Sequence, residues 1–382
     1  MDTKPGLSKI KPLFIFGTRP EAIKLCPVVL YMKARPDQFD VRVAVTAQHR
    51  QMLDQVLSVF RITPDYDLDL MLPGQTLAVA SSRMLASLEP VFADAKPDIA
   101  YVQGDTTTTL CGGLSAFYAG IPVGHIEAGL RTGDMRQPFP EEMNRVLTGR
   151  LATLHFAATS GAEQNLLREG VAPEVVHVTG NSGIDAVLNV RDRLLSGELH
   201  GGDWSFLDPS KPLVVVTAHR RESFGDGMEN ICRAIRRIAG RGDVEVVYPV
   251  HRNPNVMGPV ERILSGVAGV HLLDPLDYVP FVDLMSRASI LLTDSGGVQE
   301  EGPSLGKPVL VMRDKTERPE AVTAGTVRLV GTHEERIVAA VSRLLDSPEE
   351  RAAMCRVHNP YGDGHASERI ADATLKFFHL LR

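Results

Sequence analysis

Three carboxylates lie close to points where short apolar runs of the chain end. Asp105 follows the run Ile99 to Gln103, Glu127 follows Pro122 to Ile126, and Glu141 opens a helix-like segment soon afterwards. A carboxylate at the end of a buried strand is costly in free energy unless it has a partner. Several carboxylates at one sheet edge suit acid/base catalysis, because their mutual repulsion can hold one of them protonated.

Each of these carboxylates also has a structural explanation. An isolated Asp such as Asp105 is more often the N-cap of the next helix. Either Glu141 or Glu142 could have no role beyond complementing the dipole of the helix that it opens. The same carboxylates could ligate a metal, although no His/Asp spacing requires one, and we predict none. The four threonines Thr106 to Thr109 are unusual as helix openers, and a hydroxyl-rich helix start facing a polar ligand would account for them.

Two loops that follow apolar runs are suited to anion binding. In the stronger one, a strand leads into Ser295-Gly296-Gly297 at a helix start, where backbone N–H groups can surround a phosphate. Glu301 suits two neighbouring hydroxyls such as those of a ribose, and Arg318 follows the next strand. The weaker loop carries Arg19 and Lys24, which could equally be solvated charges on an ordinary turn.

His219 is the best placed of the twelve histidines, since it ends a predicted strand beside Arg220 and Arg221. That position suits contact with a phosphate, although a lone histidine is more often structural. His251 ends the next strand, and an ordinary capped strand end explains it equally well.

Composition narrows the class of protein. The 382 residues carry 41 Lys+Arg and 47 Asp+Glu, with 43% hydrophobic residues, which predicts a globular protein of two or three domains and argues against a general nucleic-acid or membrane binder. Four scattered cysteines without CxxC exclude a disulfide framework and favour a reducing cytosol. No signal peptide or apolar span is evident, so we expect a soluble, cytoplasmic protein. Dinucleotide, P-loop, HExxH and GxSxG motifs are absent, and we expect no cofactor.

The elements that must position these residues alternate along the chain. Short apolar runs are followed by longer helix-like segments, which is typical of βαβ units and a parallel sheet. Residues 194–212, rich in Gly, Asp, Ser and Pro, break the rhythm before a second series begins at Leu213. We predict two Rossmann-like doubly wound domains, 1–190 and 191–365, with the last helix, 366–382, joined to the first. In such sheets, ligands bind beyond the carboxyl ends of the strands.

An ordered set of motifs resembles the bacterial non-hydrolysing UDP-N-acetylglucosamine 2-epimerases. The matches extend from Gly17 to Gly364, nearly the whole chain. They are GTRPEAIK, TAQHR, GDTTTT, HIEAGLRTG, PEEMNR, HRRES, DSGGVQEEGPSLGKPVLVMRDKTERPEA and NPYGDG.

The resemblance implies a glycosyltransferase-B-like fold with a cleft between its two domains, and a homodimer. It also implies interconversion of UDP-GlcNAc and UDP-ManNAc without a cofactor, as a supply of precursors for cell-surface polysaccharide. A hydrolysing 2-epimerase and a glycosyltransferase of the same fold are the alternatives. Gln48, His49 and Gln51 resemble residues of an allosteric substrate site. The residues carried over to the active site are Arg19, Lys24, Asp105, Glu127, Glu141 and His219, and those to the UDP site are Phe281, Ser295, Gly296, Gly297, Glu301 and Arg318.

Overall fold

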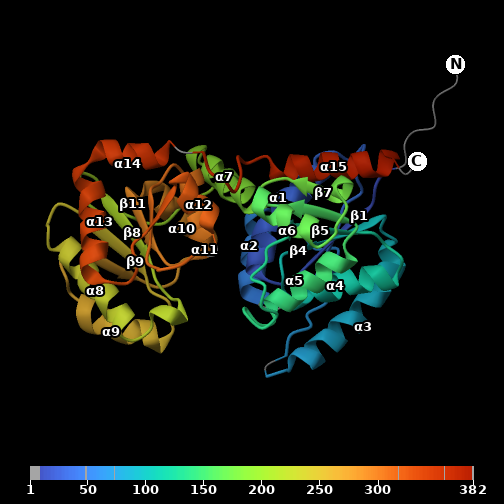
Figure 1. The fold of residues 1–382 in the computed structure, drawn as a ribbon, viewed down its shortest axis with the longest axis horizontal. Helices are drawn as coiled ribbons and strands as arrows, with labels where there is room; N and C mark the ends of the chain where they lie inside the picture. The colour runs from blue at the N-terminus through green and yellow to red at the C-terminus, as the bar shows by residue number, and fades with distance from the viewer. Residues whose placement is uncertain (1–8, 48–49, 73, 317, 357, 381–382) are drawn as a thin grey trace, which may run out of the picture. The chain divides into compact units, whose positions relative to one another are not determined.

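The computed structural model describes residues 9–47, 50–72, 74–316, 318–356 and 358–380 (Figure 1). The chain divides into two compact units. The first contains residues 1–186 and 364–382, and the second contains residues 187–363. Each unit holds one parallel β-sheet with helices packed against it, so the two Rossmann-like doubly wound domains expected from the sequence are confirmed.

The sheet of the first unit has seven strands in the order β3-β2-β1-β4-β5-β6-β7. All of their pairings are parallel. Their bounds are β1 Pro12–Phe16, β2 Arg42–Val45, β3 Tyr66–Asp67, β4 Ile99–Gln103, β5 Val123–Ala128, β6 Leu154–Ala157 and β7 Val176–Val178.

Its helices form the crossovers, as parallel strands require. Their bounds are α1 Arg19–Lys33, α2 Arg50–Val59, α3 Leu77–Ala95, α4 Thr107–Tyr118, α5 Glu141–Leu151, α6 Ser160–Arg168, the 3₁₀ helix η1 Pro173–Val175 and α7 Ser182–Leu195, whose end belongs to the second unit.

The second unit repeats this plan with six strands in the order β10-β9-β8-β11-β12-β13. The strands are β8 Leu213–Thr217, β9 Glu245–Pro249, β10 Val270–Leu273, β11 Ile290–Thr293, β12 Val309–Val311 and β13 Val327–Leu329. The helices are η2 Arg221–Ser223, α8 Asp226–Ala239, α9 Pro254–Leu264, α10 Tyr278–Arg287, α11 Gly296–Ser304, α12 Pro319–Ala324, α13 Glu334–Asp346 and α14 Pro348–Cys355.

Strands β1 and β4 form the centre of the first core, and every residue in both is buried. Burial on both faces explains why these strands read as continuous apolar runs rather than as alternating patterns. Phe14 stacks on Tyr101 with ring centroids 4.8 Å apart, a pair that adds about 0.5–1.5 kcal/mol beyond simple burial. On the next strand, Gly124 leaves room for that tyrosine, because a Cβ there would lie 2.5 Å from Tyr101 Cε1.

The C-terminal helix α15, Ala366–Leu380, packs beside α1 of the first unit (Figure 1). Asp185 of α7 accepts hydrogen bonds from the backbone N–H groups of Ala366 and Ser367 at 3.2 and 2.7 Å. These are donors that the first turn of a helix leaves unpaired. Further along α15, Thr374 forms a buried hydrogen bond with the hydroxyl of Tyr101. The helix is thus tied to the same core that holds the central strands.

In each sheet the strand order reverses once. The chain moves outward from β1 to β3 and then returns to β4 on the other side of β1; likewise it moves from β8 to β10 and returns to β11. The loops after β1 and β4, and those after β8 and β11, therefore diverge at the carboxyl edge of their sheet. Open parallel sheets bind ligands at such switch points.

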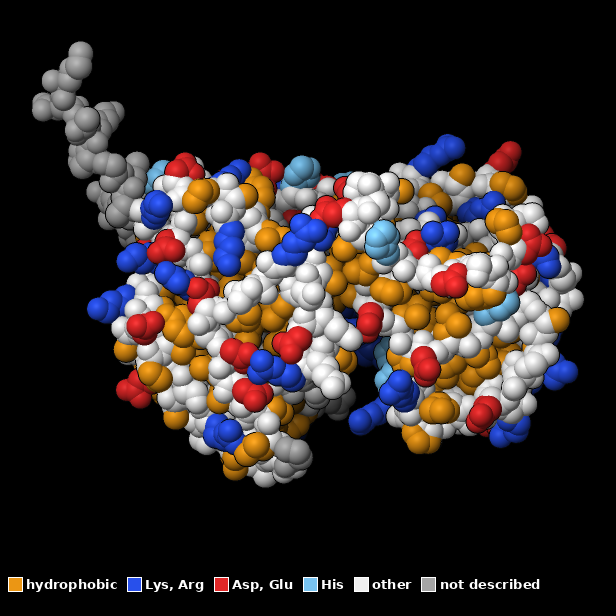
Figure 2. All heavy atoms as spheres, turned by 180° about the vertical axis from the view of Figure 1, so that it is seen from behind, with side chains coloured by type: hydrophobic (Ala, Val, Ile, Leu, Met, Phe, Trp, Pro, Cys, Tyr) orange, Lys and Arg blue, Asp and Glu red, His pale blue; other side chains and the backbone are white. Residues whose placement is uncertain are grey.

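The surface carries no dominant sign of charge on the face shown in Figure 2, where Lys and Arg are interspersed with Asp and Glu. Of the described helices, none is long and apolar enough to cross a membrane. Among the described residues there is also no group of three or more His, Cys, Asp or Glu side chains placed to hold a metal ion.

Candidate active site

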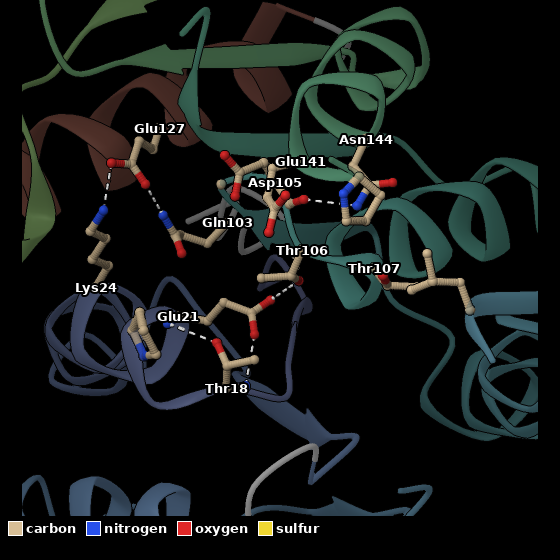
Figure 3. Close-up of a pocket in the computed structure, with 14 residues that line it drawn as sticks. Thr18, Glu21, Lys24, Gln103, Asp105, Thr106, Thr107, Glu127, Glu141 and Asn144 are labelled. Carbon is tan, nitrogen blue, oxygen red and sulfur yellow. Dashed lines mark hydrogen bonds and ion pairs between the residues drawn. The ribbon is translucent and has the colours of Figure 1, made fainter. Parts of the chain in front are cut away.

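A cavity of about 450 Å³ opens at the switch point of the first sheet (Figure 3). The start of α1, the ends of β4 and β5, and the starts of α4 and α5 supply most of its lining. The three carboxylates singled out in the sequence, Asp105, Glu127 and Glu141, all line it, and so does Lys24. Arg19 occupies the first position of α1 and is not part of the lining.

Glu127 is held in the cavity from two sides. Lys24 Nζ lies 2.5 Å from its Oε1, and the side-chain amide of Gln103 donates to its Oε2. The residue has a φ of 62°, and the register of β5 against β6 shifts between Ile126 and Ala128. A left-handed conformation in a residue other than glycine costs on the order of 1–3 kcal/mol, and such strain is concentrated at functional sites. The bulge redirects this side chain at the strand end.

Asp105 is anchored by two consecutive residues of α5. Arg145 Nη2 lies 2.5 Å from the Asp105 carboxylate, and the amide of Asn144 donates to the Asp105 carbonyl at 2.9 Å. Burial raises the pKa of Asp105, and Glu141 raises it too, whereas Arg145 and Lys24 oppose the rise. The N-cap of α4 is Thr106, so the structural explanation that Asp105 caps this helix is wrong.

Glu141 and Glu142, at the start of α5, have different surroundings. Glu141 lines the cavity, whereas Glu142 is buried and accepts hydrogen bonds from the backbone N–H groups of Thr132 and Gly133, both at 3.0 Å. Its second oxygen is 3.3 Å from Arg145. Glu142 therefore fixes the loop before the helix, and Glu141 faces the cavity.

The threonine run has a more structural role than the sequence predicted. Thr106 caps α4 and donates to Glu21 at 2.6 Å. Thr108 and Thr109 are buried, where Thr108 meets the Thr46 hydroxyl at 3.0 Å and Thr109 donates to the Gln103 carbonyl. Only Thr106 and Thr107 of the four line the cavity. The expectation that the whole run faces a ligand is wrong, because the hydroxyls of Thr106, Thr108 and Thr109 bond to internal partners.

Glu21 is a buried group in the cavity wall that connects two of its loops. It is 1% exposed, accepts hydrogen bonds from the backbone N–H groups of Gly17 and Thr18, and receives the Thr106 hydroxyl. Burial raises its pKa, and these donors oppose the rise. The carboxylate joins the loop after β1 to the loop after β4. The sequence analysis did not single it out, although Thr18 and Glu21 have the spacing of a capping box.

Sequence reasoning also missed the residues that hold the carboxylates in place. Asn144 and Arg145 stand three and four positions after Glu141, a spacing that puts them on one helix face and could have indicated them. His125 is buried in β5, and its Nε2 donates to the Gly104 carbonyl at 2.7 Å. Burial lowers the pKa of His125 to about 3, so its ring is neutral at physiological pH.

At the switch point of the second sheet, the loop after β8 carries His219 and the loop after β11 carries Ser295 to Gly297. Ser295 is the N-cap of α11, but its side chain makes no capping hydrogen bond, unlike the threonines that cap α1 and α4. The Ser295 side chain thus does not occupy the first N–H groups of α11. A helix start that binds phosphate needs such N–H groups for the ligand.

Arg318 lies directly over this helix start. A Cβ on Gly296 would fall 2.6 Å from Arg318 Cζ, so only glycine allows the guanidinium to approach the backbone. Glu300, nearly buried on α11, holds Arg318 Nε at 2.5 Å. Glu301 is one residue further, with Oε1 4.0 Å from the place of a Cβ on Gly297. The guanidinium thus lies against the glycine at the start of α11, and Glu300, which sequence reasoning missed, holds it there.

The remaining predicted residues lie elsewhere or outside the described part of the chain. Phe281 is half-buried in the first turn of α10. Gln51 is exposed near the start of α2. Gln48 and His49 lie outside the described residues.

Comparison with known proteins was made for the whole chain. The family model described as UDP-N-acetylglucosamine 2-epimerase matches residues 32–375. The chain belongs to this family of epimerases. The UDP-N-acetylglucosamine 2-epimerase of Escherichia coli (strain K12) is 58% identical over 369 residues, which cover 95% of this chain and 98% of that protein. That of Bacillus subtilis (strain 168) is 52% identical over 377 residues, with 98% and 96% covered.

A solved structure agrees with the sequence relatives. The crystal structure of UDP-GlcNAc 2-epimerase from Neisseria meningitidis, bound to UDP-GlcNAc, is 48% identical with a TM-score of 0.87. The match covers 96% of this chain and 100% of that one. The family inferred from the sequence motifs is therefore confirmed.

The surroundings of Asp105 predict how this carboxyl group titrates. We expect its pKa to lie above the ordinary value of 3.8, because burial outweighs Arg145 and Lys24. Arg145→Met should raise the pKa further, since it removes the nearest positive charge. ¹³C NMR of the labelled carboxyl group during a pH titration measures both values.

Arg150→Met, on the last turn of the same helix, is the matched control and should leave the titration of Asp105 unchanged. An Asp105 pKa below 3.8 in the wild-type protein would contradict this account of the site.

Proposed function

We propose that this chain interconverts UDP-N-acetylglucosamine and UDP-N-acetylmannosamine by the non-hydrolysing route. The observation that carries the proposal is the convergence of Asp105, Glu127 and Glu141 on one cavity, in a chain that belongs to the 2-epimerase family. Inverting C2 requires a proton to leave one face of the sugar and another to arrive on the opposite face. That task requires two acid/base groups.

The chemistry must first make the C2 proton acidic, because C2 is not adjacent to a carbonyl group. Cleavage of the C1–O bond achieves this: the electron pair leaves with UDP, and an oxocarbenium-like centre forms at C1. A carboxylate then takes the C2 proton, and the electrons of the C–H bond form the C1–C2 double bond of a 2-acetamidoglucal. Protonation of C2 from the opposite face and return of the UDP oxygen to C1 give the epimer.

The charged groups in the cavity suggest which carboxylate removes the C2 proton and which returns one. Glu127 lines the cavity with Lys24 Nζ 2.5 Å from its Oε1, and we assign it to proton abstraction. Asp105 sits where burial raises its pKa, which favours a protonated form that can return a proton. Glu141 is a third carboxylate of the set.

UDP carries the negative charge that develops when the C1–O bond breaks. We propose that Ser295, Gly296 and Gly297 bind its diphosphate through backbone N–H groups, with Arg318 and His219 supplying positive charge. Glu301 is suited to the ribose hydroxyls and Phe281 to the uracil. Each unit thus contributes a different part of the reaction machinery.

Three rival functions share some of these residues. A glycosyltransferase could use the same nucleotide cradle but would not exchange the C2 proton. A nucleotide-sugar sensor would bind its ligand without turnover. Three nearby carboxylates would not strengthen the binding of an anionic ligand, which argues against this function. A hydrolysing 2-epimerase is the nearest rival, and it would release free ManNAc and UDP.

Proton NMR in D₂O distinguishes all of these. The protein is incubated with UDP-GlcNAc and no added cofactor, and we expect UDP-ManNAc to appear with deuterium at C2 of both nucleotide sugars. Free ManNAc would favour the hydrolysing reaction. An intact C2–H bond with no product at high substrate concentration would exclude epimerisation and leave glycosyl transfer or simple binding.

Carboxylate variants test the acid/base assignment. Glu127→Gln and Asp105→Asn should each lower turnover by about 10²–10⁴-fold, the range for general acid–base groups, in the same D₂O assay. Glu349→Gln, an exposed residue of α14, is the control and should retain full activity. Near-normal turnover by a folded Glu127→Gln or Asp105→Asn protein would remove that residue from the mechanism.

The nucleotide cradle predicts a defect in binding. In Gly296→Ala the new methyl group would collide with the Arg318 guanidinium, so UDP affinity measured by calorimetry should fall by roughly tenfold or more, the effect of losing one charge-assisted contact. Gly258→Ala on α9 is the matched control, since a Cβ there meets nothing within 4 Å. Equal UDP affinities for the two variants would rule the cradle out.

The oligomeric state and the activation by substrate that the family resemblance implies are also proposals. We infer a homodimer, for which the exposed Phe117 and Tyr118 at the end of α4 are candidate contacts; a monomer mass by sedimentation would contradict it. Activation by substrate would show as sigmoidal initial rates, and hyperbolic rates would argue against it.

A cytoplasmic supply of polysaccharide precursors agrees with four cysteines that form no disulfide. Unchanged polysaccharide in a strain lacking this protein would argue against that supply.

A further inference from the structure

Asp294 occupies a position in the second unit that the proposed function does not use. It follows the last residue of β11, and it is fully buried with an exposure of 0%. Its Oδ2 accepts hydrogen bonds from the backbone N–H groups of His219 and Arg220 at 2.7 and 2.8 Å. Its Oδ1 lies 3.3 Å from Nδ1 of His219.

The environment of Oδ1 makes the His219 ring its natural partner. Among the residues that the structure describes, none donates a well-formed hydrogen bond to this oxygen. A buried carboxylate oxygen without a donor is strongly unfavourable. A proton on Nδ1 of His219 satisfies it with a small movement of the ring. Because a neutral imidazole carries one N–H, Nε2 is then left as an acceptor.

The other charged and titratable groups around His219 set the direction of its titration. Burial lowers the pKa of His219, and His251 and Arg220 act in the same direction, whereas Asp294 raises it. The His251 ring at the end of β9 stacks on His219 with centroids 5.5 Å apart. Asp294 is therefore the group in this cluster that favours the imidazolium form.

We propose that Asp294 is a positioning residue, which holds His219 in the Nδ1–H form with Nε2 directed at the diphosphate and stabilises the imidazolium as UDP departs. The inference rests on the proposed function for its chemical role. In the free protein the ring is neutral. Binding of the diphosphate favours uptake of a proton from solvent on Nε2, which then donates to a phosphate oxygen while Nδ1–H donates to Asp294.

The test uses the full-length protein with Asp294→Asn. The asparagine oxygen can still accept from the two backbone N–H groups, but its amide would present N–H to Nδ1 and force the proton to Nε2. We expect turnover to fall by about 10²–10⁴-fold, as for loss of a general acid–base group. We also expect the limb of the kcat–pH profile that reports His219 to move to lower pH, because the variant removes a negative charge.

¹⁵N NMR of labelled histidines reads the tautomer without any need for turnover. Wild-type protein should show Nδ1–H at His219, and Asp294→Asn should show Nε2–H. Asp283→Asn is the matched control: Asp283 is also nearly buried and accepts from Trp204 and a backbone N–H, but it is not in the site. Its effect should be confined to stability, with the His219 signals unchanged. The same His219 tautomer in wild-type protein and Asp294→Asn would overturn the inference.

A double-mutant comparison separates positioning from a structural role. If Asp294 acts through His219, Asp294→Asn should have little further effect on turnover in a His219→Gln background. An equal loss with and without His219 would show that Asp294 is only structural and would overturn the inference. Failure of the wild-type protein to epimerise would overturn the proposed function instead, while the tautomer measurement would still decide whether Asp294 sets the state of His219.

Discussion

The reversal of strand order in each parallel sheet is the constraint on which the site depends. At β1/β4 and at β8/β11, two loops leave the carboxyl edge in opposite directions, so helices of the two crossovers do not close over the point between them. The buried strands that end at such a point are therefore not covered there by a crossover helix. The polar groups exposed there need partners from neighbouring loops, and Lys24, Asp105, His219 and Ser295 each follow one of those four strands.

Carboxylates near the carboxyl edges of the two sheets are held by two kinds of partner. Glu21 and Asp294 each have one oxygen satisfied by two backbone N–H groups, an arrangement that holds a charge without a mobile partner. Asp105 and Glu127 instead pair with the long side chains of Arg145 and Lys24 at the cavity wall. The backbone N–H groups are fixed by their loops, whereas the cations are carried on long side chains.

The sequence predicted the strands well where burial is complete, and less well where other forces decide. β4 has the bounds of the expected run Ile99 to Gln103, and β8 begins at Leu213 as expected, because an apolar run that is buried on both faces has few alternatives. β3 was not predicted, since Tyr66–Asp67 is short and polar and pairs only at the edge. The inward turn of Thr108 and Thr109 could not be foreseen, because it depends on Thr46, which follows β2, and on Glu21 of α1. Asp294 was not singled out, since its partner His219 is 75 residues away in the sequence.

Glu127 shows how the sheet itself is adapted to chemistry. Five described residues other than glycine have a positive φ, and Glu127 is the one of them inside a strand. Glycine would adopt this conformation without strain, as Gly104 and Gly129 do on either side of the cavity wall. The chain instead has a carboxylate there, paired with Lys24 and bonded by Gln103. Since the strain of about 1–3 kcal/mol must be offset by those contacts and by the sheet, the pair and the bulge form one unit. The carboxylate is therefore held in place before any ligand binds, and its position requires no reorganisation when the reaction begins.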